Sequence, residues 1–177
     1  MKRVQLSLML FLISIPGLQV RRATQEVAYQ GKPVPVTQLG PKRAGPRTSY
    51  SGSNFKDPFR LVVRDRDAWH DVWKGIYQHH PSNGPYPEPP EVDFSREMVI
   101  VAAMGQRPTS GYEIIIDGAY ERDDRLEVVV KSVVNVKCFG VFPTVTSPLD
   151  IVRLPKIERP VVFHEIGVVP DCKLKRG

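Results

Sequence analysis

Apolar residues recur along the middle of the chain with two different periods, one helical and one extended. The helical period is carried by five apolar residues spaced three or four apart: Trp69, Val72, Trp73, Ile76 and Tyr77. This spacing places all five on one face, as in an amphipathic helix that docks on a core. Asp65 precedes the pattern and suits an N-cap, whereas Lys74 suits the C-terminal end of the helix dipole.

Strand patterns lie on both sides of this helix. The expected strands are residues 59–63, 98–104, 112–120, 126–131, 149–154 and 161–166. Residues 98–104 form a continuous apolar run, which is typical of a buried strand, and residues 112–120 and 126–131 alternate across a charged turn like an antiparallel hairpin. The sequence therefore predicts an α+β fold, in which a mostly antiparallel β-sheet packs against one amphipathic helix.

The N-terminal part of the chain is less regular. A short strand is expected around Val27 and Tyr29, but Pro33 and Pro35 restrict this region to a sheet edge or extended chain. Residues 40–58 are rich in Gly, Pro, Ser and Thr, a composition typical of a linker. We therefore expect an extended segment and linker over residues 21–58, a domain over 59–169, and a basic tail over 170–177.

The first twenty residues have the pattern of a secretory signal peptide. Two basic residues precede an apolar stretch that Pro16 and Gly17 end, and this stretch is shorter than the roughly 20 residues of a membrane span. No Cys lies near the junction, which argues against a lipoprotein. We expect a secreted or periplasmic bacterial protein without a stable membrane anchor after cleavage; a retained N-terminal anchor is the alternative.

Charge and cysteine content narrow the possible partners. The formal net charge is +6, and removal of Lys2 and Arg3 with the signal leaves +4. The excess lies in terminal segments without an aromatic platform, so we expect solvated tails and no nucleic-acid binding.

The even cysteine count in an exported chain favours a disulfide between Cys138 and Cys172, with two separate buried thiols as the alternative.

A search for catalytic or metal-binding motifs returns little. The four histidines (His70, His79, His80 and His164) show no HExxH spacing, and no CxxC pair is present. Ser110 lies between two expected strands rather than in a GxSxG elbow, and no phosphate-binding loop is found. We therefore expect no catalytic residues, no metal, no cofactor and no enzymatic activity.

The loop between the expected strands 98–104 and 112–120 is the strongest binding candidate. Its residues are Gln106, Arg107, Pro108, Thr109, Ser110, Gly111 and Tyr112. Pro108 fixes its own φ and Gly111 can take a positive φ, so the loop is expected to be rigid. Tyr112 and Arg107 are the residue types that interfaces favour as anchors. The alternative is that the loop only closes a turn and that Tyr112 is buried.

The chain resembles the family of C-terminal domains of the protease complex subunit PrcB. The resemblance runs from about Phe59 to Phe163, and rests on Asp93-Phe94, residues 105–112, and Ser147-Pro148 with residues 151–155. It implies a non-catalytic exported domain that associates with and stabilises a secreted protease. Ser110 replaces a more usual Gly of that family, and Leu149-Asp150 replaces a more usual aromatic–polar pair.

A second resemblance is confined to one loop. The stretch from Arg107 to Tyr112 is similar to the Pro-Thr-Thr-Gly-Tyr loop that chagasin-like inhibitors insert into a cysteine protease. The leading hypothesis is thus a binding domain whose partner is an exported protein, with a protease favoured. The alternatives are a chagasin-like protease inhibitor and a small-ligand or cell-envelope binding module, which would need a pocket between the Trp helix and the sheet.

Overall fold

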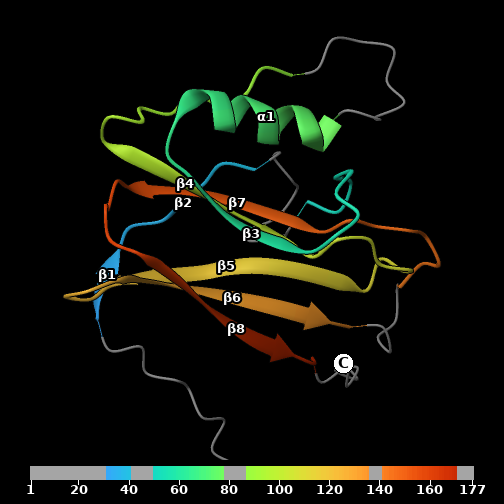
Figure 1. The fold of residues 1–177 in the computed structure, drawn as a ribbon. Helices are drawn as coiled ribbons and strands as arrows, with labels where there is room; N and C mark the ends of the chain where they lie inside the picture. Colours follow the sequence, from blue (N-terminus) through green and yellow to red (C-terminus); the bar gives the residue numbers. More distant parts are fainter. Residues whose placement is uncertain (1–30, 41–49, 78–86, 136–140, 171–177) are drawn as a thin grey trace, which may run out of the picture.

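A computed structural model describes residues 31–40, 50–77, 87–135 and 141–170, which form two stacked β-sheets and one helix (Figure 1). One sheet has the strand order β1 (Lys32–Val34), β5 (Tyr112–Glu121), β6 (Leu126–Val134), β8 (Val161–Val168). The other has the order β2 (Thr37–Gln38), β7 (Leu149–Pro155), β4 (Glu97–Ala103), β3 (Phe59–Val63). Helix α1 (Arg66–Tyr77) covers the outer face of the second sheet.

The α+β class and the mostly antiparallel pairing are confirmed. Every neighbouring pair of named strands is antiparallel except β6 and β8, which run parallel. The hairpin of β5 and β6 is as expected, with a bulge between Ile116 and Gly118. The strands are divided between two sheets rather than forming the single sheet that the sequence suggested.

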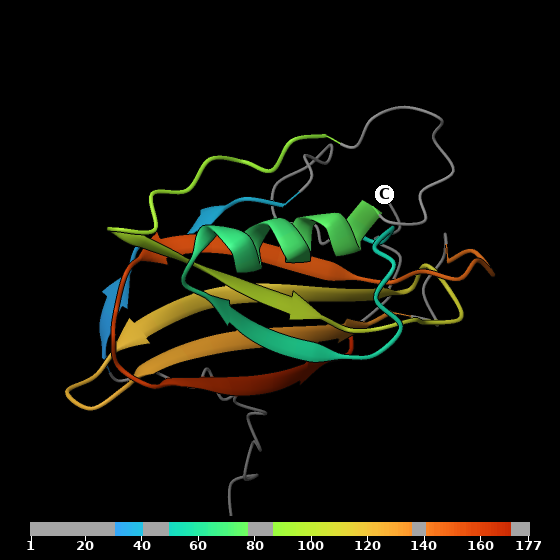
Figure 2. The ribbon, with the colours of Figure 1, turned by 45° about the horizontal axis from the view of Figure 1, so that its top comes forward.

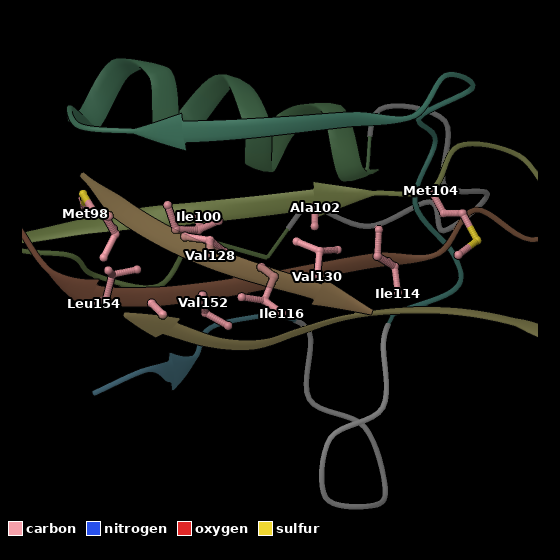
Figure 3. Packing of buried hydrophobic residues seen from close by; sticks show 12 residues of the cluster. Met98, Ile100, Ala102, Met104, Ile114, Ile116, Val128, Val130, Val152 and Leu154 are labelled. Carbon is pink, nitrogen blue, oxygen red and sulfur yellow. The ribbon is translucent and has the colours of Figure 1, made fainter. Parts of the chain in front are cut away.

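Strand β4 explains why two layers are needed, because it is apolar on both faces. Met98, Ile100 and Ala102 point into the core between the sheets, shown in Figure 3. The intervening side chains, Val99 and Val101 among them, point towards α1. Since residues Met98 to Ala103 are all fully buried, the strand must be covered on both sides, which explains its continuous apolar run.

Helix α1 forms where the apolar spacing predicts it. Asp65 is its N-cap, since its Oδ1 accepts a hydrogen bond from the backbone N–H of Ala68 at 2.8 Å. Trp69 and Trp73 are buried against the sheet. Their indole N–H groups donate to the carbonyls of Pro90 and Pro87, respectively, in the Pro-rich segment that runs alongside the helix. Both tryptophans therefore hold this segment as well as filling the core.

The packed body begins N-terminal to Phe59. Strands β1 and β2 lie in the expected extended segment that precedes the linker, and they pair with β5 and β7 respectively. Ser53 is buried, and its hydroxyl lies 2.8 Å from that of Ser147. The Ser147 hydroxyl in turn donates to the carbonyl of Phe55 at 2.6 Å. Residues 50–55 are thereby tied to the start of β7, which gives the Ser147-Pro148 pair a structural role.

Two sheet edges face each other on the side of the sandwich away from β1 and β2. Strand β3 ends one sheet and β8 ends the other, as Figure 2 shows. Arg60 of β3 crosses the gap and forms a bidentate ion pair with Glu165 of β8, with N–O distances of 2.7 and 2.8 Å. Its Nη1 also donates to the carbonyls of Phe59 and Ala103. The guanidinium of Arg60 therefore donates four hydrogen bonds and has its charge matched by Glu165.

Several predictions lie outside the described residues. These are the signal peptide over residues 1–20, the strand near Val27 and Tyr29, the Cys138–Cys172 disulfide, His79 and His80, and residues 171–177 of the basic tail. No helix within the described ranges is long and apolar enough to cross a membrane.

Candidate functional site

Two loops meet at one end of the sandwich, opposite the β5–β6 turn (Figures 1 and 2). One is the predicted loop between β4 and β5, and the other precedes β7. Gly105 begins the first loop and has a φ of +74°. Among the described glycines the positive φ falls on Gly105, whereas the sequence had pointed to Gly111 as the residue able to adopt one. A Cβ at residue 105 would lie 2.7 Å from the carbonyl oxygen of Lys56, so glycine permits this close approach.

The predicted loop is bound along its length by hydrogen bonds. The backbones of Arg107 and Thr146 exchange two hydrogen bonds of 2.8 and 2.9 Å. Ser110 and Phe142 also exchange two: the N–H of Ser110 donates to the carbonyl of Phe142, and the hydroxyl of Ser110 accepts from its N–H. Thr109 accepts from the hydroxyl of Thr146 at 2.8 Å. The loop is thus rigid because of its partner loop, beyond what Pro108 alone imposes.

The two predicted anchors lie against each other at the rim of the core. The guanidinium carbon of Arg107 lies 5.9 Å from the ring centroid of Tyr112, within the range of a cation–π interaction. Tyr112 is half-buried and packs on the core between the sheets. Arg107 is also half-buried, while Gln106 and Pro108 are exposed. Both anchors therefore combine a structural contact with access to solvent, and their binding role stays a prediction.

The partner loop carries two exposed apolar residues that the sequence patterns did not single out. Phe142 is 65 % exposed and Val145 is 69 % exposed. Pro143 between them is exposed as well. Since the hydrogen bonds of Ser110 fix the backbone of Phe142, these side chains are presented beside the predicted loop by a fixed scaffold. We call Pro108, Phe142, Pro143 and Val145 the apolar end patch.

A pocket of about 480 Å³ opens on the other side of the predicted loop. Its lining residues come from β3, β5, β6 and the loop: Pro58, Arg60, Met104, Arg107, Pro108, Tyr112, Ser132 and Val134. The lining contains two arginines and no carboxylate. Because Glu165 neutralises Arg60, Arg107 is the arginine of this lining whose positive charge has no carboxylate beside it among the lining residues.

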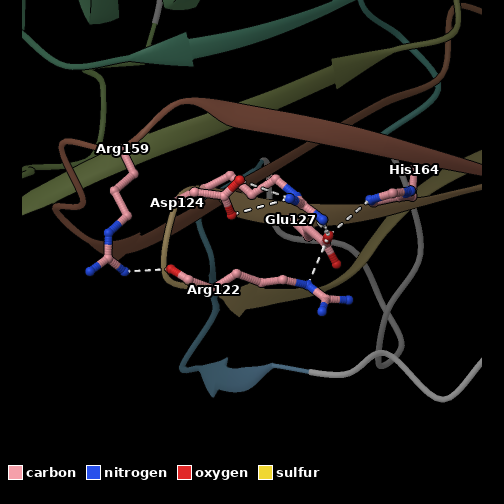
Figure 4. A network of polar contacts seen from close by, with 6 residues as sticks. Arg122, Asp124, Glu127, Arg159 and His164 are labelled. Carbon is pink, nitrogen blue, oxygen red and sulfur yellow. Dashed lines mark hydrogen bonds and ion pairs between the residues drawn. The ribbon is translucent and has the colours of Figure 1, made fainter.

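A polar network centred on Glu127 occupies the opposite end of the first sheet (Figure 4). The carboxylate of Glu127 is almost fully buried, and its Oε1 lies 2.9 Å from Nε of Arg122 and 2.8 Å from Nη2 of Arg125. Nε2 of His164 is 3.7 Å away. Burial alone would raise the pKa of Glu127, but hydrogen bonds and charge from the two arginines outweigh it and lower that pKa. The network holds the β5–β6 turn.

Substitution of Glu127 by Gln should destabilise the protein by about 1–2 kcal/mol at neutral pH, because two guanidinium groups lose their ionised acceptor. The folded pKa of Glu127 lies below its unfolded value, about 4.3 for Glu. Its stabilisation is therefore complete above that value and lost as the pH falls through the folded pKa. Urea unfolding between pH 3 and 7 should show the two proteins converging towards acid. Glu158→Gln, at a site 74 % exposed, serves as the control, and a constant difference at all pH values would contradict this account.

Asp150 is a second buried carboxyl group, and it joins the two sheets. It lies on β7, is 4 % exposed, and its Oδ2 accepts from the N–H of Ile116 on β5 at 2.7 Å. Oδ1 accepts from the N–H of Ile151 at 3.0 Å and from the side-chain amide of Gln38. Burial raises the pKa of Asp150, and these three donors oppose the shift only in part. The sequence marked this position only as a departure from the PrcB pattern.

The described residues offer little support for catalysis or for small-ligand binding beneath the helix. No group of three or more His, Cys, Asp and Glu side chains among them could hold a metal ion. The interface between α1 and the sheet, where a ligand pocket was considered, is filled by Trp69 and Trp73. A hollow of about 710 Å³ lies instead outside the helix, between Arg66, His70 and residues 88–94. No other feature there points to a ligand.

Comparison with known proteins gives one match. Residues 98–155 match the family described as PrcB C-terminal, which confirms the predicted resemblance over the segment from β4 to β7. This segment includes both loops of the candidate site. No curated protein and no solved structure matches the chain.

Proposed function

We propose that this chain is a non-catalytic accessory domain that acts outside the cytoplasm and binds an exported protein, with a secreted protease as the favoured partner. The family match supports a role in a protease complex, since the PrcB name denotes such a subunit. The signal-like start of the sequence supports export.

The apolar end patch is the observation that carries the proposal. A solvent-exposed Phe beside an exposed Val and two prolines is an unusual surface for a chain that binds nothing, because such groups mark interaction sites when they cluster. The patch is fixed by the paired backbones of both loops, so little conformational entropy would be lost on binding. Of the predicted loop residues, Pro108 belongs to the patch, and Arg107, Thr109 and Ser110 support it through their hydrogen bonds to the partner loop.

Double substitution of Phe142 and Val145 by Ser should abolish partner capture while leaving the fold intact, since both side chains are mostly exposed. The chain would be tagged at its C-terminus, exported with its own signal, recovered with its partners and examined by mass spectrometry. We expect an exported protease to be enriched with the parent and reduced at least tenfold with the variant.

The matched control replaces two exposed apolar residues outside the patch, Leu61 and Val169, by Ser. Equal capture by the parent and both variants would remove the patch from the proposal, and failure to enrich any exported protein would overturn the proposal itself. Assay of the recovered protease separates an accessory role from a chagasin-like one. An accessory domain leaves activity unchanged or prolongs it, whereas an inhibitor lowers it.

A further inference from the structure

The pocket beside the predicted loop contains a cation without a counter-ion. Arg107 makes no ion pair in the described part of the chain, and within that part its guanidinium donates one hydrogen bond, from Nη1 to the carbonyl of Gln106 at 3.0 Å. A guanidinium has five N–H donors, so most of its donors are left for a ligand. Arg60, in the same pocket, in contrast uses four of its five N–H donors on Glu165 and two carbonyls.

The surroundings of Arg107 fix its orientation. Its guanidinium lies over the ring of Tyr112, and its backbone is paired on both sides with Thr146. Stacking on a ring occupies one face of the planar group and leaves its N–H edge free for a bidentate acceptor. Tyr112 and Ser132 line the same pocket, and the hydroxyl groups of both make no hydrogen bond within the described ranges.

The remaining walls are apolar. Met104, Val134, Pro58 and Pro108 complete the lining, and Pro108 also belongs to the apolar end patch. A ligand that matched both regions would carry a negative charge next to an apolar group. Within a polypeptide, this describes an Asp or Glu side chain flanked by an aliphatic residue.

We propose that Arg107 and Tyr112 form a carboxylate-binding subsite, which receives an Asp or Glu side chain from an acidic, extended segment of the partner. The inference rests on the proposed function and adds the chemistry of the partner's segment. The carboxylate binds the free edge of Arg107, the hydroxyl of Tyr112 or Ser132 donates to it, and the neighbouring aliphatic residue covers Pro108 and Phe142.

Two short capped peptides test the subsite directly on the full chain. One has the sequence Gly-Leu-Glu-Val-Gly, and the other carries Gln in place of Glu. We expect millimolar binding of the Glu peptide, seen by NMR as shifts of the Arg107 Nε–H and Tyr112 ring signals, and at least tenfold weaker binding of the Gln peptide. The preference should also weaken with added salt.

Arg107→Gln should remove the preference for the Glu peptide, and Arg107→Lys should reduce it by keeping the charge without the planar fork. Arg96→Gln is the matched control, since Arg96 is 85 % exposed and precedes β4, whereas the pocket-lining Met104 follows the other end of that strand. Equal binding of both peptides, no binding of either, or a preference that survives Arg107→Gln would overturn the subsite. So would inorganic phosphate shifting the Arg107 signal where the Glu peptide does not.

The two proposals fail in different ways. Loss of capture in the Phe142/Val145 variant, together with normal capture by Arg107→Gln and no peptide preference, would retain the proposed function and remove the subsite. Absence of any captured exported protein, with a clear peptide preference, would retain the subsite and overturn the proposed function.

Discussion

Gly105→Ala should destabilise the protein by at least about 3 kcal/mol, which lowers the melting temperature by roughly 10 °C for a domain of this size. Two effects add at this residue. The φ of +74° disfavours any L side chain, and a Cβ would lie 2.7, 2.8 and 2.9 Å from backbone atoms of Lys56, Asp57 and Pro58. Because these neighbours are backbone, they cannot move aside as a flexible side chain could.

Gly105→Asn separates these two effects, since Asn tolerates a left-handed backbone better than Ala but has the same Cβ. If contact with residues 56–58 dominates, Asn should be as destabilising as Ala. The control is Gly167→Ala on β8, where a Cβ would meet nothing within 4 Å and stability should change by no more than about 0.5 kcal/mol. Thermal and urea unfolding measure all three variants. A Gly105→Ala protein as stable as the parent would contradict the described approach of the two segments.

Replacement of Asp150 by Ala should cost about 3 kcal/mol, because the buried N–H of Ile116 loses its acceptor. Strand β1 pairs with β5 only at residues Ala119 to Glu121, so no strand is available to accept this hydrogen bond instead. Asp150→Asn should cost about 2 kcal/mol, since its NH₂ group would face a donor. Asp117→Asn on the surface of β5 is the control, with an expected change below about 0.5 kcal/mol.

The pH dependence of the Asp150 variants has the opposite sign to that of Glu127. The folded pKa of Asp150 is raised above its unfolded value, about 3.9 for Asp. Its contribution is therefore fully present below that value and is lost as the pH rises through the folded pKa. The stability difference between the parent and Asp150→Asn should be largest in acid and narrow as the pH rises. A difference that widens with pH would contradict this account. It would show that the three hydrogen bonds to the carboxylate outweigh its burial and lower the pKa of Asp150.

Local patterns predicted the elements whose residues interact with their near neighbours in sequence. The helix, its Asp65 cap and the β5–β6 hairpin depend on spacing within a few turns or one tight connection. The run from Met98 to Ala103 indicated a buried strand, but it could not reveal that two layers cover it. That arrangement depends on pairings between strands far apart in the chain.

The sequence predicted only the part of the candidate site that contains a recognisable motif. Residues 106–112 stood out through Pro108 and Gly111, whereas the residue that needs glycine is Gly105, because the segment 56–58 approaches it from elsewhere in the chain. Phe142 has no periodic neighbours, so nothing in its local pattern distinguished an exposed aromatic from a buried one. Arg107 was predicted as an anchor from its residue type alone, and its position over Tyr112 required the fold.

The two short strands near the N-terminus impose an order on folding. Lys32 of β1 pairs with Glu121, about ninety residues later in the chain, and Thr37 of β2 pairs with Arg153, more than a hundred residues later. Neither strand can therefore pair until those later residues have been synthesised. Closing such long loops costs chain entropy before any contact compensates for it, which slows folding. We expect the corner that joins the two sheets to form last, after the β5–β6 hairpin and the strands around β4. Until then the chain exposes edges of β5 and β7 that the finished molecule covers, so this is the interval in which it is most prone to pair with another chain.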